Sequence, residues 1–149
     1  MTKLVKVDEF EFPDDLYYYA GETDSLWMKK EDGKIRLGLT DLGAYAAGKI
    51  KFIRMRPSGK KVKEGRSIGT LESGKWTGAV KSPVGGTIVE VNESLRDDPS
   101  KLNDDPYGDG WLVLIEPDDM GDIEQYQHTE GLEAWANEEV AAKKAMKGE

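Results

Sequence analysis

Turn-forming residues recur every eight to twelve positions through the middle of this sequence, and they leave room only for short strands between them. Asp32-Gly33 is a strong two-residue hairpin signal, and Pro57-Ser58-Gly59 predicts a further tight turn. In the return strand of the first hairpin, Ile35, Leu37 and Leu39 alternate with polar or small residues, which is typical of a half-buried strand. The pattern predicts a mainly β protein, a small sandwich or barrel of antiparallel sheets, and argues against a parallel α/β sheet.

Two helices interrupt this β pattern. Thr40-Asp41 is a good N-cap pair for a short helix over residues 42–47, and Gly48 is placed to end it. A longer helix is predicted over Leu132–Met146, with Leu132, Trp135, Ala142 and Met146 near one side and Glu139–Lys143 as an i,i+4 pair. The remaining strands are expected to start at Trp27 and to run over residues 49–55, 67–73, 76–81, 87–92 and 111–116.

The 149 residues are enough for one domain of ordinary size. Residues 1–25 are acidic and mixed, and we interpret them as an extension packed on that domain. The domain itself is expected over residues 26–118, with residues 119–149 as a C-terminal helical segment. In the last core strand, Trp111, Val113 and Ile115 are expected to share an inward face.

Composition excludes several kinds of reactive site. The chain has no cysteine, so it has no thiolate metal site or disulfide, and its one histidine, His128, rules out a histidine-cluster metal site. The acid pairs Asp97-Asp98 and Asp104-Asp105 lack the ligand spacing of an EF-hand. We therefore expect no metal site and no catalytic residues of the chain's own.

The formal net charge of −8 disfavours nucleic acid as a partner. Residues 49–66 nevertheless hold eight Lys or Arg against Glu64 as the one acid, which we interpret first as a solvated sheet face and next as a docking patch for an acidic partner enzyme. The N-terminal residues lack the apolar core of a signal peptide, and no later segment could span a bilayer. A cytoplasmic protein without membrane contact is expected.

The segment GTLESGKWTG, residues 69–78, comes close to the sequence of a phosphate-binding P-loop. A P-loop requires a helix after its lysine, and Ser or Thr directly after that lysine to hold Mg²⁺. Here Trp76 follows Lys75, and the next residues are rich in β-branched and glycine positions that disfavour a helix. The P-loop interpretation fails.

The same segment fits a β-hairpin whose two-residue turn is Gly74-Lys75, with Gly supplying the unusual backbone angles. A lysine at this tip projects into solvent beyond the sheet. Taken alone, such a lysine is most often a soluble turn residue, so its flanking residues decide whether it has a further role.

Those flanks resemble the lipoyl and biotinyl carrier domains. A Val-x-x-Gly turn at Val62–Gly65 precedes the strand, Glu72-Ser73 comes before Lys75, and a Pro-x-x-Gly turn at Pro83–Gly86 follows it. The biotinyl domains have Met on both sides of their lysine, whereas this chain has Gly74 and Trp76. The resemblance therefore favours lipoate.

A longer resemblance covers roughly residues 27–117 and is to the H-protein of the glycine cleavage system. The matching segments are Gly38-Leu39-Thr40-Asp41-Leu42, Ala47-Gly48-Lys49-Ile50, Val91-Asn92-Glu93 and Asn103-Asp104-Asp105-Pro106-Tyr107-Gly108-Asp109-Gly110-Trp111-Leu112. This resemblance implies a barrel-sandwich hybrid of two facing antiparallel sheets, with the modified lysine on an exposed hairpin. The C-terminal helix agrees with that family as well.

The resemblance implies a carrier without catalysis of its own. Lipoate would be joined as an amide to Lys75 by a lipoate ligase or lipoyl transferase, and Glu72, Ser73, Gly74 and Trp76 would form the flanking recognition motif. Such a swinging arm holds an intermediate at high effective concentration for each enzyme in turn. Implied partners are dihydrolipoamide dehydrogenase and, for glycine decarboxylation with an aminomethyl cargo, the P-, T- and L-proteins.

Two departures from the glycine cleavage pattern point to a different cargo. H-proteins commonly flank the lysine with Val and Ala, and they usually have His two residues before the Trp of the first core strand, where this chain has Ser25. Glu-Ser-Gly-Lys-Trp looks more like the lipoate-binding proteins of the heterodisulfide-reductase-like sulfur-oxidation pathway. The resemblance thus favours sulfur oxidation, with glycine cleavage as the alternative.

A rival hypothesis is an unmodified binding module that kept the fold and lost the arm. Lys75 and its Glu-Ser flank argue against it, and modification data would decide. A stand-alone enzyme has no support, because no nucleophile–base pair, metal cluster or cofactor loop is found in the sequence.

Overall fold

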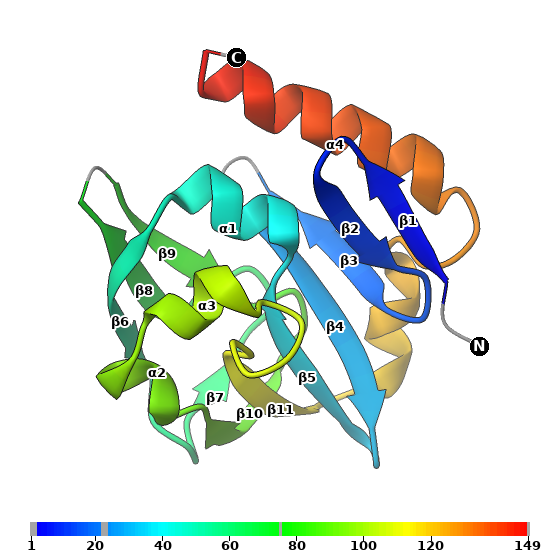
Figure 1. Ribbon diagram of the computed structural model, residues 1–149. Helices are drawn as coiled ribbons and strands as arrows, with labels where there is room; N and C mark the ends of the chain where they lie inside the picture. The colour runs from blue at the N-terminus through cyan, green and yellow to red at the C-terminus, as the bar shows by residue number, and fades with distance from the viewer. Residues whose placement is uncertain (1–2, 22–23, 75, 149) are drawn as a thin grey trace.

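The computed structural model describes residues 3–21, 24–74 and 76–148, and Figure 1 shows its layout. Within these ranges the chain forms short antiparallel strands and a long C-terminal helix, so the mainly β prediction is confirmed. In chain order the elements are β1 (Leu4–Val7), β2 (Phe10–Pro13), β3 (Tyr17–Ala20), β4 (Ser25–Glu31), β5 (Lys34–Leu39), α1 (Asp41–Ala47), β6 (Ile50–Met55), β7 (Lys61–Val62), β8 (Ser67–Ser73), β9 (Thr77–Lys81), β10 (Gly86–Val91), α2 (Ser94–Asp97), α3 (Ser100–Asp104), β11 (Val113–Pro117), the 3₁₀ helix η1 (Met120–Gln125) and α4 (Leu132–Met146).

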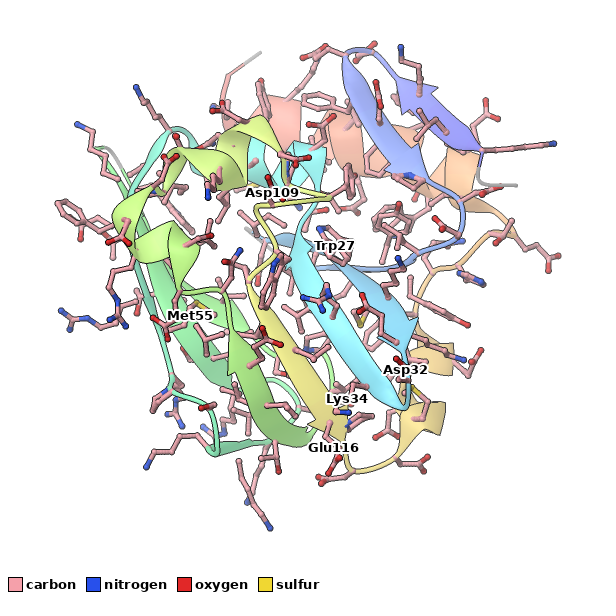
Figure 2. All side chains as sticks on the ribbon, turned by 60° about the horizontal axis from the view of Figure 1, so that its bottom comes forward. Trp27, Asp32, Lys34, Met55, Asp109 and Glu116 are labelled. Atoms are coloured by element: carbon pink, nitrogen blue, oxygen red, sulfur yellow. The ribbon has the colours of Figure 1, made fainter. Side chains whose placement is uncertain are left out.

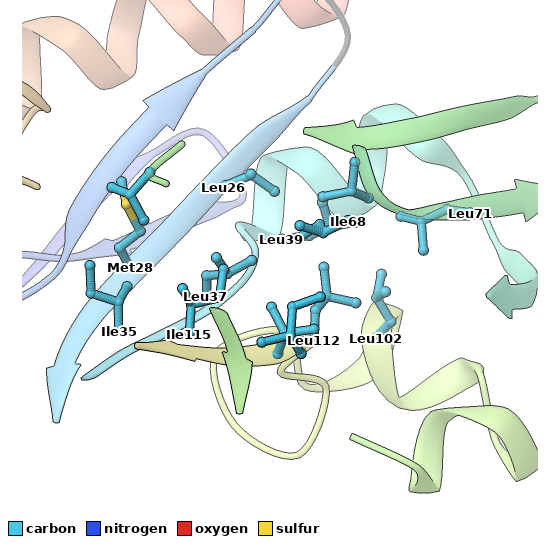
Figure 3. Packing of buried hydrophobic residues seen from close by; sticks show 14 of the residues in the cluster. Leu26, Met28, Ile35, Leu37, Leu39, Ile68, Leu71, Leu102, Leu112 and Ile115 are labelled. Carbon is cyan, nitrogen blue, oxygen red and sulfur yellow. The ribbon is translucent and has the colours of Figure 1, made fainter. Parts of the chain in front are cut away.

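Two sheets enclose the main core. One has the strand order β3-β4-β5-β11-β10-β7, and the other has the order β6-β8-β9. Figure 3 shows aliphatic side chains of β4 and β5 meeting Ile68 and Leu71 of β8 across the interior. All of these side chains are almost completely removed from water, so hydrophobic burial holds the two sheets together. Those labelled on β4 and β5 are Leu26, Met28, Ile35, Leu37 and Leu39.

The hairpin of β4 and β5 turns at Asp32-Gly33, as predicted. Asp32 has φ +48° and Gly33 has φ +78°, the left-handed pair that a tight two-residue hairpin turn requires. In Figure 2, Asp32 and Lys34 lie at one end of the sheet together with Glu116 of β11. The register Ile35 to Ile115 confirms that β5 and β11 are neighbours, although 73 residues of sequence lie between the end of β5 and the start of β11.

The last core strand begins later than the sequence predicts. Val113 and Ile115 are fully buried, but Trp111 precedes β11 and is only partly buried. The Arg36 guanidinium lies over the Trp111 ring, 4.4 Å from its centroid. The expectation that Trp111 shares the inward face of this strand is therefore wrong, because a cation–π contact holds it at the rim instead.

Helix α1 has the predicted N-cap and C-terminal residues and begins at Asp41, one residue before the predicted start. The Thr40 hydroxyl oxygen accepts a hydrogen bond from the Gly43 amide at 2.9 Å, and Gly48 ends the helix with φ +84°. The same Thr40 hydroxyl donates to the Ser25 hydroxyl oxygen at 2.8 Å, and both side chains are fully buried. This pair links the start of β4 to the helix that leads into β6.

Thr40→Val is expected to lower the free energy of unfolding by about 1–3 kcal/mol. Valine has the shape of threonine, but it removes the helix cap and leaves the buried Ser25 hydroxyl without its donor. Thr40→Ser keeps the hydroxyl and loses one methyl group, so its cost should be near 0.8 kcal/mol. Urea denaturation of the three proteins measures the difference, and a Val variant as stable as the wild type would contradict this role.

The N-terminal segment and α4 build a second core. The β1–β2 hairpin contacts α4, and β3 pairs with β4 from Tyr17–Met28 to Ala20–Ser25, so the expected extension contributes a strand to the main sheet. Figure 1 shows this hairpin between α4 and the rest of the molecule. The buried members of this core are Val7, Phe10, Phe12, Leu16, Tyr18, Trp27, Leu42, Leu132, Ala136 and Val140.

Helix α4 has the predicted bounds but a different buried face. Leu132 is buried as expected, whereas Met146 is 59% exposed and Lys143 is 2% exposed. The Lys143 ammonium forms the predicted pair with Glu139 at 3.2 Å and also donates to the Gly21 carbonyl at 3.2 Å. These two partners offset the cost of burying the charge.

No helix in the described part of the chain is long and apolar enough to cross a bilayer.

Candidate functional site

The β8–β9 hairpin closes where the sequence predicts, between Ser73 and Trp76. β8 ends at Ser73, as expected, and the Ser73 amide donates to the Trp76 carbonyl at 2.7 Å. This bond closes a turn of two residues, although the regular ladder of β9 begins only at Thr77. Lys75 itself lies outside the described residues. Ser73 and Trp76 bound the turn.

Glu72 and Ser73 point to opposite sides of the hairpin. Glu72 is exposed on the outer face of the sheet, directly across from Phe52 on one side and Thr77 on the other. Ser73 is 8% exposed, and its hydroxyl donates to the Trp76 carbonyl at 3.4 Å. The flanking motif therefore divides into an outward carboxylate, accessible to another protein, and a buried hydroxyl that holds the turn.

Gly74 does not supply the unusual backbone angles expected of it in the turn, and Gly69 of β8 is required by the close approach of a neighbouring strand. Neither Gly69 nor Gly74 has a positive φ. At Gly69 a Cβ would lie 2.7 Å from the Arg54 carbonyl oxygen and 3.0 Å from the Met55 Cα, so the close approach of β6 excludes a side chain there. At Gly74 a Cβ would meet only the Lys51 side chain, with its Nζ at 3.4 Å.

Trp76 is accommodated by a glycine two residues further along. Its side chain is half-buried and packs against the main core. A Cβ at Gly78 would lie 2.9 Å from Trp76 Cε2 and closer still to other atoms of the same ring, so the indole lies over the Gly78 backbone. The large Trp76 and the small residue at Gly78 therefore form one packing unit.

A groove of about 460 Å³ lies beside this turn. The end of α1 contributes Ala46 and Ala47, the hairpin contributes Trp76, and Lys51 and Lys147 come from β6 and from the residue after α4. Among the residues that line this groove, only those of the hairpin are predicted from the sequence as site residues. The others come from segments far apart in the chain, and no spacing in the sequence connects them.

The groove combines an apolar floor with a cationic rim. Ala46, Ala47 and Trp76 supply apolar surface, while Lys49, Lys51 and Lys147 are exposed around it. None of the described residues that line the groove is acidic. It can hold an apolar chain that extends from the turn, and its rim favours a neutral or anionic group at the end of that chain over a cationic one.

Ser25, which stands where histidine is expected, has a structural role. Its side chain is fully buried in the bond with Thr40, and its carbonyl oxygen accepts from the Thr40 amide at 3.0 Å. Gly43 packs so closely on the Ser25 carbonyl that a Cβ there would overlap it. Ser25 therefore offers no titratable group, and it is not among the described residues that line the groove.

A second hollow, of about 450 Å³, lies near the β1–β2 turn and is lined among others by Phe10, Asp41 and Tyr45. Burial raises the pKa of the Asp41 carboxyl, and that carboxylate accepts a hydrogen bond from the Glu11 amide at 3.1 Å. Asp41 thus attaches the N-terminal hairpin to α1. This hollow lies where the N-terminal hairpin packs on α1, and the β8–β9 turn remains the candidate site.

Comparison with known proteins gives a consistent result. A family model described as glycine cleavage H-protein matches residues 16–139. The chain is 50% identical over 106 residues to "Glycine cleavage system H protein 3" of Aquifex aeolicus; the match covers 70% of this chain and 65% of that protein. It is 36% identical over 123 residues to "Glycine cleavage system H protein" of Oceanobacillus iheyensis, which covers 83% of this chain and 95% of that protein.

A solved structure is similar over nearly its whole length. The crystal structure of a glycine cleavage system H protein from Mycobacterium marinum superposes with a TM-score of 0.72 at 32% identity, and the match covers 85% of this chain and 99% of that one. The barrel-sandwich prediction is consistent with this match. The chain therefore belongs to the glycine cleavage H-protein family, whose members are non-catalytic subunits that carry lipoate covalently on a lysine.

Proposed function

We propose that this chain is a lipoyl carrier whose arm is attached to Lys75. The observation that carries the proposal is the closed two-residue turn between β8 and β9, with Glu72 exposed beside it, in a chain of the H-protein family. A lysine with an unperturbed pKa near 10.4 is protonated at neutral pH, so the lipoylating enzyme must remove a proton before the amide forms.

The residues around the turn fit a lipoyl group attached at its tip. The floor of Ala46, Ala47 and Trp76 gives an apolar chain a surface to lie on, and the adjacent Lys51 lies against Gly74 without closing the groove. When bound, lipoate supplies a dithiolane, and thereby the redox sulfurs that a chain without cysteine lacks. The chain itself positions the arm and presents it to successive enzymes.

For the cargo, we propose the glycine cleavage reaction as the first candidate. Relatives named for that system lie across bacteria and archaea; "Probable glycine cleavage system H protein 2" of Sulfolobus acidocaldarius, for example, is 43% identical over 116 residues. The partners would then be the P-, T- and L-proteins, the last a dihydrolipoamide dehydrogenase, together with the enzyme that attaches lipoate.

Sulfur transfer in a heterodisulfide-reductase-like system is the second candidate, and two features of this chain favour it. Ser25 is buried and hydrogen-bonded to Thr40, so it does not supply the titratable side chain of the histidine that is usual in glycine cleavage. The rim of Lys49, Lys51 and Lys147 also opposes a protonated amine at the end of the arm and attracts an anionic sulfur group.

The two candidates differ in one assay. Lipoylated protein, glycine and the host's glycine decarboxylase should release CO₂ and load the arm with the aminomethyl group if the first candidate is correct, and intact mass measures the loading. A lipoylated H-protein known to be active with that decarboxylase is the control. Loading at less than about one hundredth of the control rate, equivalent to about 3 kcal/mol of lost transition-state stabilisation, would exclude glycine cleavage and leave the sulfur candidate.

A further inference from the structure

The outer face of the β6–β8–β9 sheet differs from the rest of the surface. Phe52 is 66% exposed, the most exposed of the large hydrophobic side chains in the described ranges. Phe52, Glu72 and Thr77 form one row across the three strands, and Arg54, Thr70 and Ala79 form the next. In Figure 1 this sheet lies at the left of the molecule, and the side chains of both rows are exposed.

The positive charge on this side is not neutralised within the chain. Among the residues that the structure describes, none of the eight Lys and Arg side chains between residues 49 and 66 forms an ion pair. Cations elsewhere, such as Lys30 with Glu124 at 2.6 Å and Lys144 with Asp8 at 3.0 Å, do have carboxylate partners. Of these side chains, Phe52 and Arg54 are of the types enriched in protein interfaces.

The outer face of the sheet is also hollowed. A hollow of about 460 Å³ is lined by Phe52, Ile53, Arg54, Thr70 and Glu72, and Glu72 is the one acid among the described residues that line it. A partner that fits it would place apolar surface against the Phe52 ring and carboxylates near Arg54 and the neighbouring Lys51. Aromatic and arginine side chains of this kind contribute most of the binding energy in many interfaces.

Distance along the strands indicates which partner must touch this face. A strand rises about 3.3 Å per residue and its neighbour lies about 4.8 Å away, so Phe52, across from Glu72, is within about 9 Å of Gly74 and Arg54 within about 15 Å. A standard interface covers about 800 Å² of each partner, equivalent to a disc of about 16 Å radius. An enzyme that acylates an amine at this turn must centre its contact there and so covers Phe52 and Arg54. An enzyme that acts at the far end of the arm need not.

We propose that Lys51, Phe52 and Arg54 form the docking surface for the lipoylating enzyme. That enzyme would present carboxylates around the entrance of its active site and an apolar recess for Phe52. The proposal rests on Lys75 as the attachment site. It assigns a role to the basic segment in docking an acidic partner, in place of a solvated sheet face alone.

The test measures the binding of unmodified protein to the purified lipoylating enzyme of the same host by surface plasmon resonance, and the rate of lipoylation at several carrier concentrations. Phe52→Ser is expected to raise Kd and KM at least about tenfold with little change in kcat. The double variant Lys51→Glu/Arg54→Glu should do the same and remove the salt dependence of Kd. All substituted side chains are exposed, and thermal unfolding checks that each variant is folded.

A matched control, the double variant Lys29→Glu/Arg56→Glu, carries the same two charge reversals outside the expected contact. Arg56 lies just past the end of β6 and Lys29 lies on β4 in the other sheet, so this variant should change Kd less than about threefold. Unchanged Kd and KM in the Phe52 and Lys51/Arg54 variants would overturn the docking proposal while wild-type lipoylation upholds the attachment site. Normal lipoylation with a raised KM for dihydrolipoamide dehydrogenase would also overturn it, because the face would then bind a different enzyme. A wild-type protein that is not lipoylated by the active enzyme would overturn both proposals.

Discussion

Lys75→Arg is expected to abolish lipoylation and all carrier turnover while the fold is retained. The arginine side chain stays protonated at any physiological pH and offers no amine for acylation, so no amide can form at this position. The change keeps one long cation in a two-residue turn, and the free energy of unfolding should stay within about 0.5 kcal/mol of the wild type. Intact mass after incubation with the lipoylating enzyme, lipoate and ATP measures the first effect, and urea denaturation the second.

Lys81→Arg is the matched control for this prediction. Lys81 is an exposed lysine in β9 of the same hairpin, so this variant should be lipoylated like the wild type. A lipoyl increment on the Lys75→Arg protein, mapped by peptide mass to any other lysine, would show that the attachment site has been assigned to the wrong residue.

Trp27→Ala is expected to have the largest effect on stability, a loss of about 3–5 kcal/mol. The indole is 2% exposed, and it packs so closely on the Gly38 backbone that a Cβ there would lie 2.9 Å from its Nε1. That nitrogen also donates to the Pro106 carbonyl at 2.8 Å, and Figure 2 shows Trp27 close to the loop that carries Asp109. A domain of this size has about 5–15 kcal/mol of stability in total, so the variant would be partly unfolded near room temperature or on modest heating.

Trp27→Phe separates packing from hydrogen bonding. It keeps an aromatic ring but removes the N–H, so the Pro106 carbonyl loses its donor, and the expected cost is about 1–3 kcal/mol from that loss together with the smaller ring. Urea denaturation of both variants gives the two values. A loss below about 1 kcal/mol for Trp27→Ala would mean that the loop does not depend on this indole.

Local signals in the sequence were sufficient to place the β8–β9 hairpin. The turn residues of the hairpin, and the cap residues of α1, act within a few positions of one another, and their effect on the backbone can be predicted without knowing the rest of the fold. The bounds of β8 and α4 agree with the prediction for this reason. The closure of the hairpin between Ser73 and Trp76 follows from the same reasoning, whereas the backbone angle of Gly74 does not.

Features that depend on distant segments could not be predicted. The buried face of α4 is set by the β1–β2 hairpin, which the sequence analysis did not resolve, and so the burial of Lys143 against the Gly21 carbonyl was not expected. The groove beside the turn joins Ala46, Lys51 and Lys147 from three separate segments. Glu72 and Ser73 belong to one motif in the sequence, but strand alternation places them on opposite faces of the sheet. Only the burial of the two side chains shows which face is outward.

The measurement that tests the central claim most directly is the intact mass of the protein purified from its native host, beside the Lys75→Arg variant expressed in the same host. A lipoyl-sized increment on the wild type alone is the result predicted for a carrier with its arm on Lys75. A wild-type protein without the increment, from cells in which another lipoyl carrier is fully modified, would contradict the claim and would identify the chain as a binding module that kept the H-protein fold without the arm.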